Sequence, residues 1–255
     1  MKTANQWLWS AFGKHPSASD FFSVGASFPL ALDFSGWVKT GYSPLAERRV
    51  GSSCSWRFWA RGRSRGEIAC GLLRDSHDCF GRPFPLLILG TGPLPAWEEN
   101  WEKLPAVLER VWRRIELDAA RLFGSLAAFE EELGRTRPPD PDWPAPHVAT
   151  GAEDGEALAP LLERLGEAAK KVSSGDTGSI SLGGDGADDG HIFIMHATSV
   201  LKKSLTATPN SVFIGGTNSH SFLVFFRRPM RPPDFGSLWD IHNANKILSH
   251  LVGEG

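Results

Sequence analysis

The hydrophobic period of the sequence changes abruptly near residue 95, and this change restricts the fold more than any other feature. Before it, short apolar runs at 55–61, 67–73 and 84–89 are separated by loops rich in turn formers, a pattern typical of β-strands. After it, apolar residues recur every three or four positions from Trp97 to Leu122, as in an amphipathic helix. The chain therefore combines a sheet with helices that cover it.

More elements are predicted on either side of this change. Pro105 lies within the helical run and cannot donate a backbone hydrogen bond, so it either kinks the helix or starts a new first turn. Gly124 separates off a second helix that ends near Gly134. The other predicted elements are strands over 6–12, 192–196, 211–215 and 222–226, and helices over 27–40, 157–172 and 235–252.

The order of elements favours an α/β fold with a mixed sheet. Strands, helices, strands and a helix follow one another without a regular βαβ repeat, so we expect helices on both faces of the sheet. Each half would be small alone, which favours one domain over 1–255. Residues 135–154 hold five prolines and form either a linker or a surface loop.

Net charge, cysteine spacing and hydropathy restrict the cellular compartment and the classes of partner that fit the chain. A formal net charge of −2 gives no long-range attraction for polyanions, so nucleic acid is not expected as a partner. Cys54, Cys70 and Cys79 form no CxxC pair, which fits a reducing compartment. We find no signal-peptide pattern and no apolar run of about eighteen residues, so we expect a cytoplasmic protein without membrane insertion.

No sequence motif gathers the residues of a catalytic or metal centre. GxSxG and HExxH do not occur, and Cys54 is interpreted as a small apolar residue that enters a strand. His191 and His196 would point to opposite faces of a predicted strand. The acidic loop 185–190 lacks the glutamate of a calcium loop, and 215–219 lacks the lysine of a P-loop. We expect no catalytic residue, no metal and no cofactor.

The segment 56–65 interleaves aromatic rings with arginines. On a strand, Trp56 and Phe58 share one face and are expected in the core, whereas Arg57 lies on the other face. The arginines of the following loop, Arg63 and Arg65, are expected in solvent. A nucleic-acid surface is the alternative interpretation of this pattern.

Three short motifs occur in order in the first half of the chain. The first follows the opening strand and consists of Gly13-Lys14-His15-Pro16-Ser17-Ala18-Ser19-Asp20-Phe21. The second is Ser55-Trp56-Arg57-Phe58, and the third is Asp78-Cys79-Phe80-Gly81-Arg82-Pro83-Phe84-Pro85-Leu86. With the tryptophan-rich helix behind them, they resemble the TagF/ImpM family of type VI secretion accessory proteins over about residues 6–134.

This resemblance implies a fold and a role. The fold would be a three-layer α/β/α sandwich that serves the type VI secretion apparatus from the cytoplasm. The role would be post-translational repression of its assembly or firing through protein contacts, notably with a forkhead-associated scaffold protein. The resemblance transfers no catalytic residue, so we expect a non-enzymatic regulator.

Thirteen motif residues are candidates for a structural or an interaction role. They are Gly13, Pro16, Ser17, Asp20, Phe21, Trp56, Arg57, Phe58, Asp78, Gly81, Arg82, Phe84 and Pro85. We favour structural clamping for the polar ones, because buried charges are normally paired. The alternative is a hydrolase-like enzyme with a site around Asp20, Asp78 and Arg82.

Physical roles can be predicted for several of these residues. Gly13 and Pro16 would shape the turn after the first strand, and Asp20 would cap the next helix. Gly81 would permit a tight backbone, and Arg82 would hold an aspartate, Asp78 or Asp20, in a charge-assisted pair.

Overall fold

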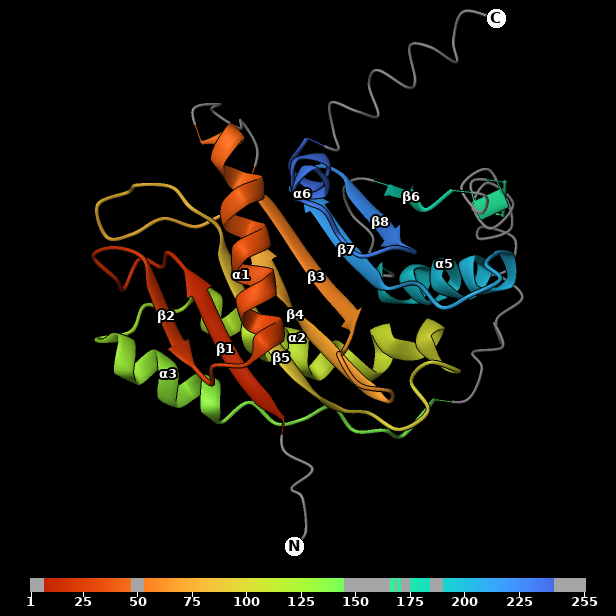
Figure 1. Cartoon of the computed structure of the whole chain (residues 1–255), viewed down its shortest axis with the longest axis horizontal. Coiled ribbons are helices and arrows are strands. Elements are labelled where there is room, and N and C mark those ends of the chain that lie inside the picture. Colours follow the sequence, from red (N-terminus) through yellow and green to blue (C-terminus); the bar gives the residue numbers. More distant parts are fainter. Residues whose placement is uncertain are drawn as a thin grey trace, which may run out of the picture.

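The computed structural model describes residues 7–46, 53–144, 166–167, 169–170, 175–183 and 190–240 (Figure 1). In this part of the chain, eight strands form one open sheet in the order β2-β1-β5-β4-β3-β7-β8-β6. The strands are β1 (Leu8–Gly13), β2 (Phe22–Gly25), β3 (Cys54–Arg61), β4 (Glu67–Arg74), β5 (Leu86–Pro93), β6 (Thr177–Gly183), β7 (Ser211–Thr217) and β8 (Ser221–Phe226). The helices are α1 (Pro29–Tyr42), α2 (Leu104–Ala120), α3 (Leu126–Gly134), α5 (Gly190–Ser204) and α6 (Pro232–Trp239), with 3-10 turns η1 (Ser43–Leu45) and η2 (Trp101–Lys103).

The α/β class is confirmed, but the expected mixed sheet is wrong. Every strand pairing among the described residues is antiparallel. The connections explain this result, because β3, β4 and β5 follow one another through loops too short for the crossover that a parallel pair needs. β7 and β8 form a hairpin in the same way, and β7 pairs with β3.

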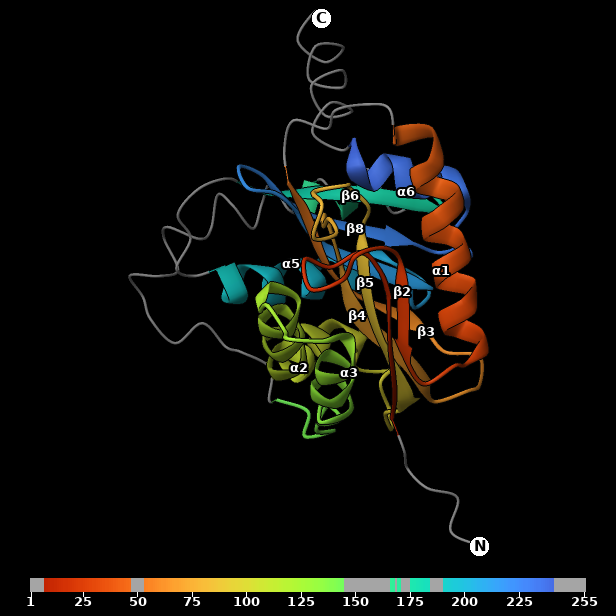
Figure 2. The ribbon, with the colours of Figure 1, turned by 90° about the vertical axis from the view of Figure 1, so that its left-hand side faces the viewer.

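Helices lie on both faces of the sheet (Figure 2). α1 and α6 pack on one face, whereas α2, α3 and α5 pack on the other. Side chains alternate between the faces along β3, as the sequence pattern predicts. Phe58 stacks on Phe34 of α1 with ring centroids 5.3 Å apart, and Trp59 meets Trp97 on the opposite face at 5.6 Å.

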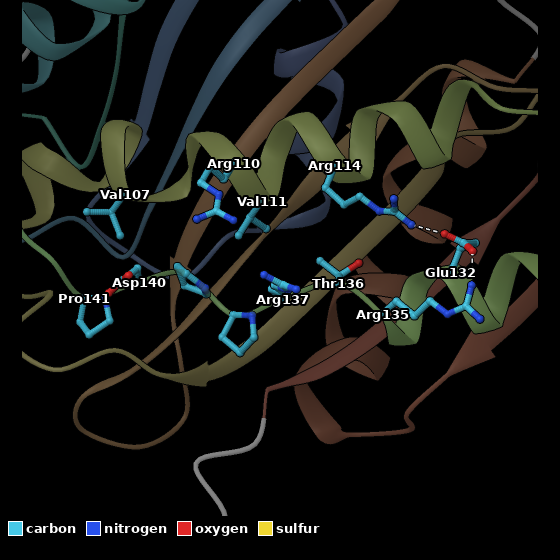
Figure 3. A pocket seen from close by; sticks show the side chains of 12 residues that line it. Val107, Arg110, Val111, Arg114, Glu132, Arg135, Thr136, Arg137, Asp140 and Pro141 are labelled. Carbon is cyan, nitrogen blue, oxygen red and sulfur yellow. Dashed lines mark hydrogen bonds and ion pairs between the residues drawn. The ribbon is translucent and has the colours of Figure 1, made fainter.

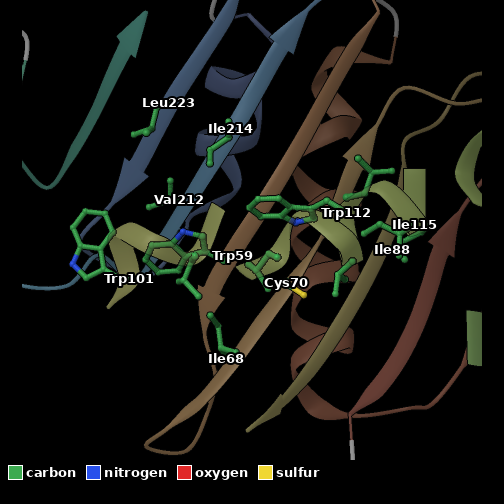
Figure 4. Close-up of a cluster of buried hydrophobic side chains, with 14 of the residues drawn as sticks. Trp59, Ile68, Cys70, Ile88, Trp101, Trp112, Ile115, Val212, Ile214 and Leu223 are labelled. Carbon is green, nitrogen blue, oxygen red and sulfur yellow. The ribbon is translucent and has the colours of Figure 1, made fainter. Parts of the chain in front are cut away.

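Aromatic side chains fill much of the core. Nine of the ten tryptophans are buried and Trp143 is partly buried. Figure 4 shows Trp59, Trp101 and Trp112 between α2 and the sheet, beside Cys70 and Ile88 of the central strands. The nine buried indoles therefore serve packing of the core.

Many of the predicted elements are confirmed. The strands expected over 55–61, 67–73, 84–89, 211–215 and 222–226 correspond to β3, β4, β5, β7 and β8, and the first strand and the helix over 27–40 are also present. Pro105 lies in the first turn of α2 rather than at a kink. The helix after Gly124 is α3, and its N-cap Ser125 accepts a hydrogen bond from the Ala128 backbone at 3.2 Å.

One predicted strand is wrong and two strands were not predicted. Residues 192–196 belong to helix α5, where Phe193, Ala197 and Leu201 are buried at steps of four. The strand geometry expected for His191 and His196 is therefore also wrong. β2 and β6 are the two edge strands of the sheet; β2 has only four residues, and β6 has seven, of which only Ile180 is buried.

Some predictions fall outside the described residues. Of the helix expected over 157–172, only 166–167 and 169–170 are described, and they are helical. The closing helix is described up to residue 240, where α6 has ended. Residues 135–144 contain no helix or strand beyond the end of α3, and 145–154 are not described. The single domain over 1–255 stays a prediction.

Candidate functional site

Two of the three motifs meet at one end of the sheet. β1 and β5 are neighbours, and Gly13 at the end of β1 pairs with Leu86 at the start of β5. The loops that flank these two residues therefore leave the sheet at the same end. They are also joined directly, because the Cys79 backbone donates a hydrogen bond to the Ala18 carbonyl at 2.8 Å. We call the group formed by Lys14, Asp20, Phe21, Asp78, Phe80, Arg82 and Phe84 the Asp78 cluster.

Asp78 is the centre of this cluster, and its side chain is fully buried. One carboxylate oxygen accepts hydrogen bonds from the backbone N–H groups of Phe80 and Arg82, both at 3.0 Å. The other oxygen contacts Lys14 Nζ at 3.0 Å and Arg82 Nε at 2.7 Å. Burial alone would raise the pKa of Asp78, but the bonds from Lys14 and Arg82 hold it well below its usual range.

Lys14 is the partner that the sequence interpretation did not single out. It is 5% exposed, so its ammonium group depends on Asp78 for compensation. Its Nζ also lies 4.8 Å from the centroid of the Phe21 ring. The only sequence signal for this role is the position of Lys14 directly after Gly13 in the first motif.

Arg82 joins the two loops at the surface. Its Nη2 donates to the Ser19 carbonyl at 2.7 Å and lies 3.6 Å from Asp20 Oδ1. The predicted charge-assisted pair with Asp78 is confirmed. The predicted helix cap at Asp20 is wrong, because the next element is strand β2, and Asp20 accepts a hydrogen bond from the adjacent Phe21 N–H.

Two tight turns shape the loops. In the first, Ala18 N donates to His15 O at 2.8 Å, with Pro16 at the second position that proline favours. In the second, Gly81 N donates to Asp78 O at 2.9 Å, and Gly81 has a φ of +74°. The turn roles predicted for Pro16 and Gly81 fit this geometry.

The first loop is also fixed to α3 and the segment before it. Ser17 Oγ accepts a hydrogen bond from Phe123 N at 2.7 Å. The His15 ring stacks on Phe129 of α3 at 5.2 Å, and burial lowers the pKa of this histidine. The loop that carries the first motif is therefore anchored on both sides.

Aromatic rings surround the ion pairs. Phe84 is buried and packs edge-on against Phe21 and Tyr42, with centroids 4.6 and 5.1 Å away. Phe21 itself is 52% exposed, and Phe80 is 71% exposed with Arg82 over its ring at 5.4 Å. The Asp78 cluster thus presents two aromatic rings to solvent from a loop pair whose polar groups are internally bonded.

The second motif lies away from this cluster, in the middle of the sheet. Trp56 and Phe58 are fully buried, as predicted. Arg57 lies on the α2 side, where it bonds Glu116 through Nε and Nη2 at 2.6 and 2.8 Å and Glu109 through Nη1 at 2.8 Å. This motif therefore attaches the central strand to α2.

At Gly13, beside the Asp78 cluster, the backbone leaves no room for a side chain. Its φ is +126°, and an added Cβ would lie 2.0 Å from the carbonyl oxygen of Pro85, which is buried. We expect Gly13→Ala to lower the free energy of unfolding by roughly 3 kcal/mol or more, measured by urea denaturation. Gly81→Ala is the matched control, because a Cβ there meets open space, and it should cost only about 1 kcal/mol. Equal losses in the two variants would contradict the packing described here.

The described residues contain neither a metal-binding cluster nor a membrane-spanning helix. No three His, Cys, Asp or Glu side chains of these residues lie close enough together to hold a metal ion. Nor does any helix in the same part of the chain have the length and apolar character to cross a membrane.

The fold and the site define an α/β domain with a well-anchored loop surface at one end of an antiparallel sheet. Residues 10–135 match the model of the TagF N-terminal domain, which is described as type VI secretion system-associated. Over that stretch the chain matches this family, and the family resemblance of the motifs is confirmed. The match ends just after α3, so it covers the first half of the chain only.

Comparison with other proteins adds little to this assignment. No curated protein sequence matches the chain. A crystal structure of PA0076 from Pseudomonas aeruginosa PAO1 resembles it with a TM-score of 0.49 and 18% sequence identity, over 91% of this chain and 93% of that chain.

Proposed function

We propose that the chain is a non-enzymatic accessory protein of the type VI secretion system that acts in the cytoplasm as a three-layer α/β/α scaffold. It would repress assembly or firing of the apparatus after translation, through contacts with its protein components. The observation that carries this proposal is the match of residues 10–135 to a type VI secretion system-associated domain. By family resemblance, one partner would be a forkhead-associated scaffold protein.

The geometry of the Asp78 cluster supports recognition of a protein. Phe21 and Phe80 expose large apolar area, and the loops that carry them are held by Asp78, Arg82 and Lys14. Aromatic side chains on preorganised loops are favourable interface residues, because little conformational entropy is lost on binding. We therefore place the partner contact at this end of the sheet.

The hydrolase alternative receives less support. A general base needs a carboxylate that can accept a proton near neutral pH, whereas hydrogen bonds hold the pKa of Asp78 low despite its burial. Burial also raises the pKa of the Cys54 thiol to about 12, which disfavours a nucleophilic thiolate. Neither of the two cavities described below is lined by Asp20, Asp78 or Arg82.

The nucleic-acid alternative is also disfavoured. Arg57 is bound by two glutamates, and Arg61 Nη1 lies 2.7 Å from Glu98 Oε1. Guanidinium groups neutralised in this way have little charge to offer phosphates.

Affinity purification tests the proposal. The tagged chain, expressed in cells that carry a type VI secretion system, is expected to recover components of that apparatus. The control is the tag alone in the same cells. Recovery of no such component above this control would contradict the proposed function.

A further inference from the structure

A cavity of about 710 Å³ lies between α2 and the end of α3 (Figure 3). One wall is formed by Val107, Arg110, Val111 and Arg114 of α2. The other is formed by Glu132 and residues 135–141, which follow α3. Its size is within the range of ligand-binding sites, about 300–1,000 Å³. The second cavity, about 320 Å³, lies elsewhere, beside Trp37 and Met230.

The lining of the larger cavity is predominantly cationic. It holds four arginines, Arg110, Arg114, Arg135 and Arg137, but only two acidic residues, Glu132 and Asp140. Glu132 is shared by Arg114 and Arg135, so one carboxylate is used by two guanidinium groups. Two of the four cations are therefore already compensated.

The other two cations are free to bind a ligand. Within the described residues, Arg110 and Arg137 make no ion pair and no side-chain hydrogen bond, and both are exposed. Figure 3 shows Arg110 extending from α2 toward the segment that carries Arg137. A planar guanidinium binds a carboxylate through two parallel hydrogen bonds, so this pair suits an anionic group.

A buried hydroxyl provides an independent observation. Thr136 lines the cavity and is 5% exposed, yet its Oγ1 has no hydrogen-bond partner. A buried polar atom left unpaired carries a desolvation cost. An anionic group held by the arginines would accept a hydrogen bond from this hydroxyl and remove that cost.

The apolar part of the lining indicates the shape of the ligand. Val107 and Val111 contribute side chains from α2, and three prolines line the facing segment, Pro138, Pro139 and Pro141. Proline-rich backbone is extended and offers a flat apolar wall. Among the described lining residues there is no aromatic ring on which a nucleobase would stack. These features favour an extended peptide over a nucleic acid.

We propose that this cavity binds an acidic, extended segment of a partner protein, whose carboxylates pair with Arg110 and Arg137 and accept a hydrogen bond from Thr136. The proposal goes beyond the proposed function, because it concerns a different face from the Asp78 cluster and does not depend on the secretion system.

Fluorescence anisotropy with the purified full-length chain tests this inference. The probe is a short labelled peptide of alternating glutamate and alanine, and the reference is its glutamine counterpart. The glutamate peptide is expected to bind more tightly. The double variant Arg110→Glu, Arg137→Glu should bind this peptide more weakly, with each of the two substitutions contributing roughly tenfold or more. Arg110→Gln with Arg137→Gln should weaken it in the same direction, and this milder pair serves if the charge reversal disturbs the fold.

The matched control changes the net charge by the same amount elsewhere. Arg63 and Arg65 are exposed in the β3–β4 loop, so Arg63→Glu with Arg65→Glu should leave peptide binding within about twofold, apart from general screening. Equal loss in the control, unchanged binding in both cavity variants, or tighter binding of a short oligothymidylate than of the peptide would overturn the proposal. None of these outcomes bears on affinity purification of secretion components, so the two proposals can fail separately.

Discussion

Replacing Phe80 by aspartate is expected to weaken capture of the secretion-system partner by at least roughly thirtyfold, which corresponds to about 2 kcal/mol. Phe80 is 71% exposed, and the turn beneath it is fixed by two backbone hydrogen bonds to Asp78. A carboxylate at this position would lose its hydration on binding and would find no compensating charge or hydrogen bond. The measurement is quantitative recovery of the partner in affinity purification, with the Tm of each protein determined in parallel.

Leu117 provides the matched control for this substitution. It is 68% exposed on α2, so Leu117→Asp changes polarity at a position of similar exposure away from the Asp78 cluster. We expect both variants to keep the Tm of the unchanged protein and only the Phe80 variant to lose capture. Loss of capture in the Leu117 variant alone would place the contact on α2 instead.

Replacing Asp78 by asparagine is expected to destabilise the fold more than any other single change of a polar side chain in the Asp78 cluster. An amide cannot accept from all the donors that now surround the carboxylate, and Lys14 would remain charged and buried without a counter-ion. The Tm should fall by at least about 5 °C. Removing the stranded cation as well, in Lys14→Met with Asp78→Asn, should restore part of this loss, because Arg82 is half exposed and can turn to solvent.

The low pKa of Asp78 predicts how its contribution to the free energy of unfolding changes with pH. The pKa of Asp78 is lower in the folded protein than in the unfolded chain, where an aspartate titrates near about 3.9. Its contribution to stability is therefore complete above about pH 5 and declines as the pH falls through that value. The difference in unfolding free energy between the unchanged protein and Asp78→Asn should be constant from neutral pH to about pH 5 and should shrink below it. A difference that grows on acidification would contradict the assignment of Asp78 as an ionised hub.

The central strands and the long helix could be predicted from the sequence because burial imposes a strict period on them. Along β3, the alternation of Trp56, Arg57, Phe58 and Trp59 determines which side chain faces which layer of helices. Along α2, Leu104, Leu108 and Ile115 repeat at helical spacing. In both elements the hydrophobic period follows directly from which side chains must be buried.

The incorrect and missing predictions concern elements in which burial imposes only a weak or ambiguous period. β2 has four residues and buries only Phe22, and β6 is rich in glycine and serine with Ile180 and Leu182 as its only apolar side chains other than glycine, so the alternation in each edge strand is too short to detect. The start of α5 places Phe193 and Met195 among other apolar residues, and a short continuous apolar run fits a strand as well as a helix.

The composition of the candidate site could be predicted only in part, because its geometry depends on sheet order. Arg82 and Asp78 are four residues apart, so their pairing follows from local sequence. Lys14 and Asp78 are brought together only because β1 lies next to β5, which no local pattern reveals. The exposure of Phe80 likewise depends on the turn that Gly81 closes.

Partner capture by the Lys14→Met, Asp78→Asn variant, measured at a temperature where thermal unfolding shows that it is folded, separates a purely structural role of the buried charges from a direct role in binding. If the polar side chains serve only to hold the loops in place while Phe21 and Phe80 make the contact, the folded variant should recover the partner at close to the level of the unchanged protein. A folded variant that fails to recover the partner would show that the buried charges themselves take part in function.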